Sequence, residues 1–375
     1  MLNVLISGAG VAGPALAYWL RHHGFGATVV ERAPAIRTGG QPIDVRGTAL
    51  DVVERMGLLD EIRRHATDMT GMSYVDPSGA ELWRDTGRTL TGGDLACPDV
   101  ELMRSDLVRI MHAATRHDSE YVLGDSITSI TQREHDVLVT FDHGAPRTFD
   151  LVVGADGLHS AVRGLVFGDE SRFAHHLDTY LAIFSVPNFL GLDRWQVFHQ
   201  SPGKLAGVLS TRRNTEVRAM LGFEAPRLDF DHRDVEGQKR LMAERFGADG
   251  WEVPRLLEEM WRAPDFFCDS MSQIRMPGWS SGRVALAGDA GYCASPLSGM
   301  GTSLALVAGY VLAGELAAAD GDHTSAFAAY EREMRDYVRG CQELAITNGR
   351  GQEDQGPLNR AARSVALKPY SVQPA

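Results

Sequence analysis

Lysine is scarce in this chain of 375 residues, and acidic residues outnumber basic ones. Only Lys204, Lys239 and Lys368 occur, so arginine supplies nearly all of the 37 basic residues against 49 acidic ones, for a net charge of −12. Nucleic acids and anionic membranes attract basic surfaces. The charge balance therefore predicts no nucleic-acid partner.

Cysteine is also rare, and its spacing excludes the usual cysteine-based sites. The four residues, Cys97, Cys268, Cys293 and Cys341, form no C-x-x-C pair and no metal-type cluster. We expect reduced thiols, a cytoplasmic location and no metal site.

The sequence lacks a clear membrane segment. No charged leader with a cleavage site precedes the first apolar strand. The apolar run at residues 303–319 is slightly short for a span and contains Gly309 and Glu315, so we expect a buried helix. There is no internal repeat, and the length suits one large or two intertwined domains.

A strand followed by a carboxylate and a glycine-rich turn stands late in the chain. The buried-strand pattern at residues 284–287 ends at Gly288-Asp289, and Pro296 and Gly299-Met300-Gly301 precede an apolar helix at residues 302–319. Asp289 can accept hydrogen bonds from sugar hydroxyls, and bare amides in the glycine turn can face a carbonyl or a developing anion. An ordinary β-loop-α connection has the same pattern, so this stretch alone does not decide the function.

The N-terminus carries a dinucleotide-binding pattern. Residues 3–7 form an apolar strand, a helix is expected at residues 11–23, and the second strand ends at Glu31. The first turn reads G-x-G-x-x-G and consists of Gly8, Gly10, Val11, Ala12 and Gly13 with the intervening Ala9. In this context the glycines permit a tight turn, approach of a pyrophosphate and close helix packing, while the acid binds a ribose.

Two arginines precede predicted helices. Arg46 stands before a helix at residues 49–56 and can neutralise a phosphate, contact a flavin or be structural. Arg104 leads a helix at about residues 105–116 and is a second candidate for the cofactor side.

A second carboxylate follows a strand in the middle of the chain. Strands are expected at residues 127–131, 137–141 and 149–153, and the last runs into Gly154-Ala-Asp156-Gly157, followed by Ser160 and Arg163. As at Asp289, a carboxylate directly follows the end of a buried strand. Asp156 can therefore bind hydroxyl groups and order the loops around a nucleotide.

The character of the chain changes after residue 173. Alternating segments predict an antiparallel sheet, then two helices and a strand that returns to the first half. The expected strands are residues 180–186, 195–199, 205–211, 216–223 and 266–274, and the helices are residues 235–246 and 251–260. An amphipathic helix is expected at residues 325–347, with partial disorder beyond residue 348.

The three motifs, in this order, resemble the single-component FAD-dependent aromatic monooxygenases, the p-hydroxybenzoate hydroxylase-like family. The Arg104-Ser-Asp-Leu segment and the length are most similar to the branch that contains the tetracycline-inactivating monooxygenase. The resemblance implies an α/β fold, in which a Rossmann-like FAD-binding domain with a β-meander is interleaved with a smaller α+β substrate domain built on an antiparallel sheet. The implied boundaries are 1–70, 101–174 and 275–320 for FAD, 71–100 and 175–274 for substrate, 321–348 for a long C-terminal bridging helix and 349–375 for a tail.

The resemblance also implies residue roles. Gly8, Gly10, Val11, Ala12 and Gly13 would cradle the pyrophosphate of FAD, and Glu31 and Arg32 would flank the ribose of adenosine. Arg104, Asp156, Gly157, Gly288 and Asp289 would hold the pyrophosphate and ribityl region, with Asp156 also serving NAD(P)H. The catalytic set beside the flavin ring would be Arg46, Pro296, Gly299, Met300 and Gly301.

The implied reaction is hydroxylation. NAD(P)H, a transient co-substrate, would reduce FAD, O2 would form a C4a-hydroperoxide, and one oxygen would pass to an aromatic or polycyclic, antibiotic-like substrate. The middle sheet would form the pocket wall, with Phe184, Trp195, Phe198, His199, Leu209, Arg213, Met220 and Phe223 as candidates; alternation turns about half of them away. A monomer or a homodimer would both suit this chemistry.

Three alternatives share the FAD-binding half. A flavin-dependent halogenase would carry W-x-W-x-x-P, but Trp251-Glu-Val-Pro254 lacks the second tryptophan. A dehydrogenase or reductase without oxygen transfer, and a non-catalytic protein that binds flavin or another small molecule, both stay open.

Overall fold

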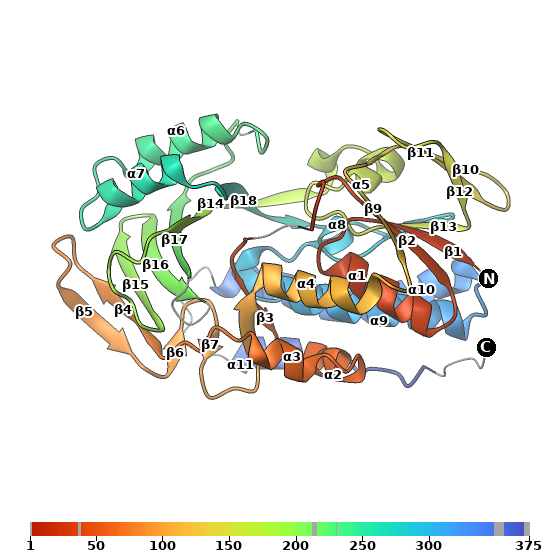
Figure 1. Cartoon of the computed structure of the whole chain (residues 1–375), viewed down its shortest axis with the longest axis horizontal. Coiled ribbons are helices and arrows are strands. Elements are labelled where there is room, and N and C mark those ends of the chain that lie inside the picture. The colour runs from red at the N-terminus through yellow and green to blue at the C-terminus, as the bar shows by residue number, and fades with distance from the viewer. Residues whose placement is uncertain (1, 37–38, 212–215, 230, 349–355, 371–375) are drawn as a thin grey trace.

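The computed structural model describes residues 2–36, 39–211, 216–229, 231–348 and 356–370. Two large sheets lie next to each other, each with helices packed on it (Figure 1). The chain enters the second sheet twice and returns each time to the first, so the two halves are interleaved. This is the α/β architecture that the resemblance implies.

The first sheet has six strands in the order β19-β20-β13-β1-β2-β9, all parallel except β19. Its strands are β1 (Asn3–Ser7), β2 (Gly26–Glu31), β9 (Glu120–Leu123), β13 (Leu151–Gly154), β19 (Ser280–Ser281) and β20 (Val284–Leu286). The register pairs Ser7 with Gly154 and Gly154 with Leu286. The carboxyl ends of β1, β13 and β20 therefore meet at one edge, which is where open α/β sheets bind ligands.

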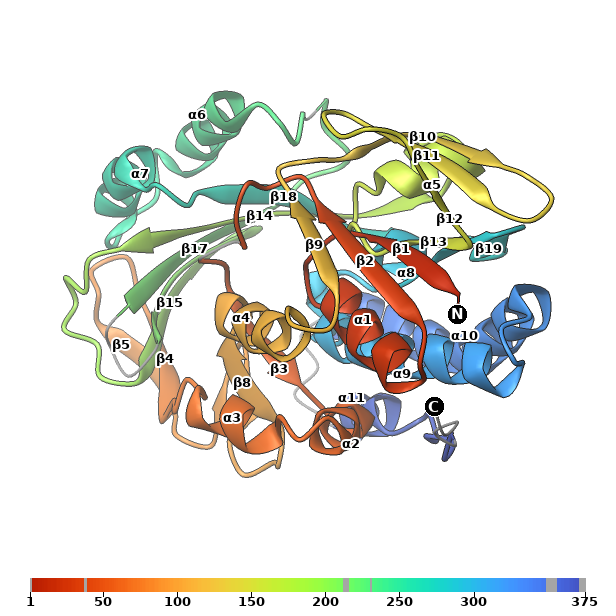
Figure 2. The same ribbon diagram turned by 45° about the vertical axis from the view of Figure 1, so that its right-hand side comes forward.

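Long helices cover one face of this sheet, and a small sheet and α5 cover the other (Figure 2). The main helices are α1 (Ala12–His22), α4 (Arg104–Thr115), α9 (Gly301–Ala318) and α10 (His323–Asn348). Within the described residues, α9 is the one helix long and apolar enough to span a membrane, but 83% of it is buried in the protein. The expectation of a buried helix is confirmed.

The small sheet corrects one predicted strand. It consists of β10 (Ile127–Gln132), β11 (Val137–Phe141) and β12 (Arg147–Phe149). The expected strand at residues 149–153 is confirmed for residues 151–153, which belong to β13 in the first sheet, but its start is wrong because the chain breaks at Asp150 and Phe149 ends β12. The carboxylate of Asp150 accepts a 2.6 Å hydrogen bond from the amide of Asn3, which anchors the crossing.

The second sheet has seven strands in the order β18-β14-β17-β16-β15-β4-β5. Its strands are β4 (Gly71–Val75), β5 (Glu81–Asp85), β14 (Ala174–Val186), β15 (Trp195–Ser201), β16 (Lys204–Thr211), β17 (Glu216–Glu224) and β18 (Phe267–Ile274). Two helices, α6 (Val235–Phe246) and α7 (Val253–Arg262), pack on one face through a core that includes Met242, Phe246 and Met260. The opposite face turns toward the first sheet.

Short elements connect these layers. They are β3 (Pro42–Val45) with β8 (Val100–Met103), β6 (Arg88–Thr89) with β7 (Gly93–Asp94), α2 (Thr48–Arg55), α3 (Leu59–Arg64), α5 (Ala161–Phe167), the 3₁₀ turns η1 (Glu170–Arg172) and η3 (Pro296–Ser298), α8 (Asp289–Tyr292) and α11 (Gly356–Ala362).

The expectation of disorder beyond residue 348 is wrong for residues 356–370. Tyr370 and Lys368 donate hydrogen bonds of 2.7 and 2.8 Å to the carboxylate of Glu315 in α9. Thr48 donates a 3.0 Å hydrogen bond to the carbonyl of Val365. This segment therefore packs against the helices of the first half.

Candidate functional site

The turn between β1 and α1 is a backbone cradle that only glycine can form. Gly8 has φ +106°, and a Cβ there would lie 2.5 Å from the carbonyl oxygen of Ala155. A Cβ on Gly13 would lie 1.9 Å from the carbonyl oxygen of Gly8. Val11 is the N-cap of α1 and Ala12 its first residue, and the amides of a first helical turn lack intrahelical partners. These groups suit a phosphate.

Glu31 and Arg32 follow at the end of β2. The Glu31 carboxylate accepts hydrogen bonds of 2.9 Å from the amide of Ala9 and 3.0 Å from the amide of Ala33. The acid is thus fixed beside the glycine turn, at the position where the dinucleotide-binding pattern places the group that binds a ribose. Arg32 is exposed at the rim.

Arg104, Gly10, Gly40 and Asp289 converge from four separate segments. A Cβ on Gly10 would lie 3.7 Å from the guanidinium of Arg104, and one on Gly40 would lie 3.4 Å from the Arg104 Cβ. Asp289 is accessible to solvent, yet protein atoms surround it closely enough that burial raises its pKa, while the charge of Arg104 opposes the shift. An accessible carboxylate in such a recess can receive hydroxyl groups of a ligand.

Asp156 shapes its own turn. Its carboxylate accepts hydrogen bonds from the hydroxyl of Ser160, the amide of Val162 at 3.1 Å and the hydroxyl of Ser7 at 3.4 Å. Burial raises its pKa, and these hydrogen bonds oppose the rise. Gly157 follows with φ +85° and no atom within 4 Å of an added Cβ, so the turn is open on that side.

The turn from β20 to α9 lies across the same edge. Gly288 has φ +62°, and its added Cβ would lie 3.2 Å from the Cβ of Ala12. Pro296 opens η3, Gly299 adopts the left-handed conformation with φ +64°, and Gly301 begins α9. A Cβ on Gly301 would lie 3.8 Å from the Asp289 carboxylate. The predicted glycine turn and carboxylate are therefore neighbours.

The expectation of bare amides in this turn is wrong for two of its three residues. The amide of Gly299 donates to the carbonyl of Pro296 at 3.0 Å, and the amide of Met300 donates to Ser298 Oγ at 3.1 Å. The Met300 side chain is fully buried in the core. Gly301, as the first residue of a helix, is the remaining candidate donor.

Arg46 is enclosed by acidic residues that the sequence did not indicate. Its guanidinium lies 2.9 Å from the carboxylate of Asp44 and 3.1 Å from that of Asp99, and it donates to the carbonyl of Gly92 at 3.0 Å. Two carboxylates already face its charge, which argues against neutralisation of a phosphate and gives Arg46 a structural role in this cage, while its contact with a flavin stays a prediction. Burial raises the pKa of Asp44 to about 7, although Arg46 opposes the shift.

Two atoms of this cage have no partner among the described residues. Arg46 Nε and Asp44 Oδ1 are buried without a hydrogen bond, although buried polar atoms nearly always have one. Arg46 Nε lies 4.0 Å from the Cβ position of Gly299. Orphaned polar atoms, accessible Asp289 and the glycine cradle all meet at one edge, which fits the ring and chain of FAD.

The candidate wall of the second sheet divides between its faces. Phe198, Leu209 and Met220 share a cluster with Met72 and Ile183 on the face toward the first sheet. The other four candidates point to the face that α6 and α7 cover. Phe184 and Phe223 belong to the core with these helices, and the ring centre of His199 lies 6.2 Å from that of Trp251. Trp195 precedes Gln196 in β15 and therefore points to the face opposite to Gln196. These four belong to the half of the candidates that alternation turns away from the first sheet, and among them Phe184, His199 and Phe223 are not placed to contact a ligand on that side. Arg213 lies outside the described residues.

Two buried polar residues on the face toward the first sheet were missed. Arg218, in phase with Met220, is 4% exposed and bonds to Asp265 and, at 2.8 Å, to Glu216. A Cβ on Gly39 would lie 3.9 Å from its guanidinium. Gln196 accepts from the amide of Leu90 at 3.0 Å and donates to Thr91 at 2.6 Å. A charged residue inside an otherwise apolar strand was the signal for Arg218.

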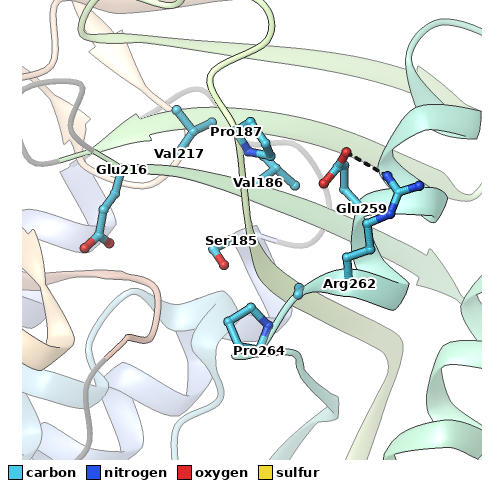
Figure 3. Close-up of a pocket in the computed structure, with 9 residues that line it drawn as sticks. Ser185, Val186, Pro187, Glu216, Val217, Glu259, Arg262 and Pro264 are labelled. Atoms are coloured by element: carbon cyan, nitrogen blue, oxygen red, sulfur yellow. Dashed lines mark hydrogen bonds and ion pairs between the residues drawn. The ribbon is translucent and has the colours of Figure 1, made fainter.

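A cavity of about 340 Å³ opens near Arg218, between the ends of β14 and β17 and the end of α7 (Figure 3). Glu216, Ser185 and Pro264 lie along one side of it, and the ion pair of Glu259 with Arg262 lies along the other. Ser185 donates a 2.6 Å hydrogen bond to Asp265, the partner of Arg218. The cavity therefore lies at the edge of the second sheet, where residues of both faces line it: Ser185 and Glu216 from one face, and Val186 and Val217 from the face of α7.

The fold and the site define an FAD-binding α/β protein. Comparison with known families agrees: a model described as an FAD binding domain matches residues 1–344. The chain belongs to this family and is an FAD-dependent monooxygenase.

Individual relatives extend over nearly the whole chain. An uncharacterised protein of Mycobacterium tuberculosis, Rv1260, is 51% identical over 372 residues, which cover 99% of this chain and 100% of the relative. A flavin-dependent monooxygenase of Legionella longbeachae is 39% identical over 345 residues, covering 92% and 88%. The crystal structure of tetracycline destructase Tet(51) is 35% identical, with a TM-score of 0.89 and coverage of 99% and 100%.

Proposed function

We propose that the enzyme uses NAD(P)H and O2 to hydroxylate an aromatic or polycyclic small molecule. When bound, FAD supplies hydride acceptance from the nicotinamide and activation of O2. In the overall reaction, one oxygen atom enters the substrate and the other leaves as water, while NAD(P)H and a proton are consumed. The observation that carries the proposal is the meeting of the FAD-type cradle with an apolar wall that ends in a buried arginine.

The proposed roles of the chain's residues are binding, orientation and exclusion of water. The glycine turn with Gly8 and the N-terminus of α1 would hold the pyrophosphate, with Asp289 and Arg104 at the ribityl chain. Arg46 Nε and the turn at Gly299 would contact the flavin ring. On this proposal the first sheet and its helices form the FAD-binding part, and the second sheet forms the substrate-binding part.

The substrate would lie against the wall that contains Phe198, Leu209 and Met220. Large apolar side chains suit a flat ring system, and excluding water there would protect the activated oxygen. Arg218 at the end of the wall would pair with a phenolate or enolate oxygen, because its fixed guanidinium favours anionic oxygen. The similarity to Tet(51), whose name marks it as a tetracycline destructase, makes tetracyclines the first molecules to test.

The test is aerobic oxidation of NADH and NADPH by the purified holoenzyme, with phenols, quinones and tetracyclines as ligands and mass spectrometry of the products. We expect one ligand class to stimulate oxidation and to gain one oxygen. Stimulation that yields a dehydrogenated or reduced product would instead favour a dehydrogenase. Flavin that NAD(P)H cannot reduce, with every ligand present, would refute the proposed reaction.

Substitution of two methionines on opposite faces of the second sheet distinguishes the proposed substrate wall from the core. Met220 is 9% exposed on the face proposed to meet the flavin, whereas Met242 belongs to α6 and is fully buried in the core on the other face. We expect Met220→Ala to change the KM for the substrate and leave FAD content unchanged. Met242→Ala should lower stability by about 2–5 kcal/mol, as buried Met→Ala changes do, without changing KM.

A further inference from the structure

A second group of ionisable side chains lies outside the proposed flavin contacts. His159, in the turn after β13, has one ring nitrogen 2.9 Å from the carboxylate of Glu170 in η1 and the other 2.9 Å from the carboxylate of Asp269 in β18. Since carboxylates only accept hydrogen bonds, both nitrogens must donate, and the ring carries a positive charge. The site is therefore an imidazolium held between two carboxylates.

A second histidine lies on this ring. His232, in the segment that leads into α6, stacks on His159 with ring centres 3.9 Å apart and an angle of 10° between the planes. Burial and the charge of His159 both lower the pKa of His232, so a neutral ring covers a charged one. Asp231 and Arg233 act on His232 from the same segment.

The cluster is connected to both carboxylate turns of the flavin site. Glu170 also pairs with Arg163, whose side chain is completely buried. Arg163 donates to the carbonyl of Leu158, beside His159, at 2.6 Å, and to the carbonyl of Ala290, next to Asp289, at 2.9 Å. The turn with His159 also contains Asp156. One polar network thus joins β18 of the second sheet to the turns that carry Asp156 and Asp289.

We propose that His159 is a positioning residue: its imidazolium ties the second sheet to the turns of Asp156 and Asp289, so that FAD binding and the charge of His159 support each other. The inference rests on the proposed function, because it takes these two turns to hold FAD. Loss of the charge would release Glu170 and Asp269 together and weaken the placement of both turns.

The pH dependence follows from the contacts. Burial opposes the charge of His159, but its hydrogen bonds to Asp269 and Glu170 raise its pKa to about 9. The protonated ring of His159 therefore stabilises the folded protein. This stabilisation is complete at pH values below about 6.5, the ordinary pKa of histidine, and is lost as the pH rises through about 9. The groups that face the ring are Glu170, Asp269 and His232, with Arg163, Asp231 and Arg233 behind them.

The experiment titrates FAD into apoprotein and follows flavin fluorescence between pH 7.5 and 9.5. If FAD binding raises the pKa of His159 by one unit above about 9, the Kd of the wild type increases roughly threefold over this window. His159→Gln should bind FAD more weakly at pH 7.5 and lack this pH dependence. The control is His135→Gln, because the His135 side chain is 85% exposed, and it should behave as the wild type does.

The outcomes separate the possible failures. If the wild type binds FAD but His159→Gln has the same Kd and pH profile, only the positioning role is overturned, even if the variant melts earlier. If the wild type does not bind FAD, the proposed function fails with it. Should His159→Gln not fold, Asp269→Asn removes one carboxylate and should move the wild-type profile to lower pH; an unmoved profile overturns the inference.

Discussion

Gly13 offers the sharpest test of how the backbone forms the proposed pyrophosphate cradle. The substitution Gly13→Ala adds one methyl group inside α1, where alanine is favoured over glycine by about 1 kcal/mol. That methyl would lie 1.9 Å from the carbonyl oxygen of Gly8. The oxygen belongs to the backbone and cannot rotate away as a side chain could, so α1 must withdraw from the turn.

The magnitude follows from these two terms. Overpacking of a tight interior costs about 1–3 kcal/mol and occasionally more. Contact with a fixed carbonyl belongs at the upper end, about 3 kcal/mol, so we expect a net loss of about 2 kcal/mol in the free energy of unfolding after the helix gain of about 1 kcal/mol. Withdrawal of the α1 N-terminus should also weaken FAD binding by roughly tenfold or more, which corresponds to about 1.4 kcal/mol.

The assay combines urea unfolding with titration of FAD into the apoprotein, and Gly340→Ala is the matched control. Gly340 lies within α10, and an added Cβ there has no neighbour within 4 Å. The control should therefore gain up to about 1 kcal/mol from helix propensity and bind FAD normally. A Gly13→Ala variant with wild-type stability and FAD affinity would refute the cradle geometry.

Three further predictions concern carboxylates and their partners. Asp289→Ala should weaken FAD binding by about tenfold or more, since hydrogen bonds to a charged group contribute about 1.5–3 kcal/mol, whereas exposed Asp336→Ala should not; equal affinities in a fluorescence titration would contradict the assignment. Because burial raises the pKa of Asp44 to about 7, the folded state takes up a proton that the unfolded state lacks, and this group should make the wild type less stable as the pH rises from 4 to 7. Asp44→Asn should remove that part of the slope in urea unfolding, and a slope shared by both proteins would argue against it. Joint replacement Lys368→Met and Tyr370→Phe should lower the unfolding free energy by about 1–3 kcal/mol, because Glu315 is only 8% exposed; an unchanged midpoint would show that the C-terminal segment contributes little.

The first sheet could be predicted from sequence because its signals are local. Buried parallel strands are continuous apolar runs, and Gly8, Gly154 and Gly288 mark where three of them end or the next turn begins. The carboxyl ends of parallel strands share one edge, so the three motifs had to meet there. What local signals could not supply was the Asp44 and Asp99 cage of Arg46, which depends on the pairing of β3 with β8.

Other failures have the same physical origin. The break at Asp150 is set by a hydrogen bond to Asn3, far away in the sequence. The exposed strand β9 was not predicted because its residues alternate weakly and its partner β2 is remote. The C-terminal segment looked polar, yet Lys368 and Tyr370 are ordered by Glu315, a buried carboxylate that needs partners.

The second sheet sets the limit of sequence reasoning about this enzyme. Alternation shows that neighbouring residues point to opposite faces but does not show which face meets the flavin, and both faces of β14 and β17 are apolar. Phe184 and Ile183 are equally good candidates by sequence, but the helices α6 and α7 cover only the face of Phe184. The polar residues break this symmetry: Arg218 cannot be buried without partners, and the separate loops that contain Gly39 and Asp265 lie beside its guanidinium. On the proposed function, a buried charge in such a strand therefore indicates the ligand-facing side better than the aromatic residues around it.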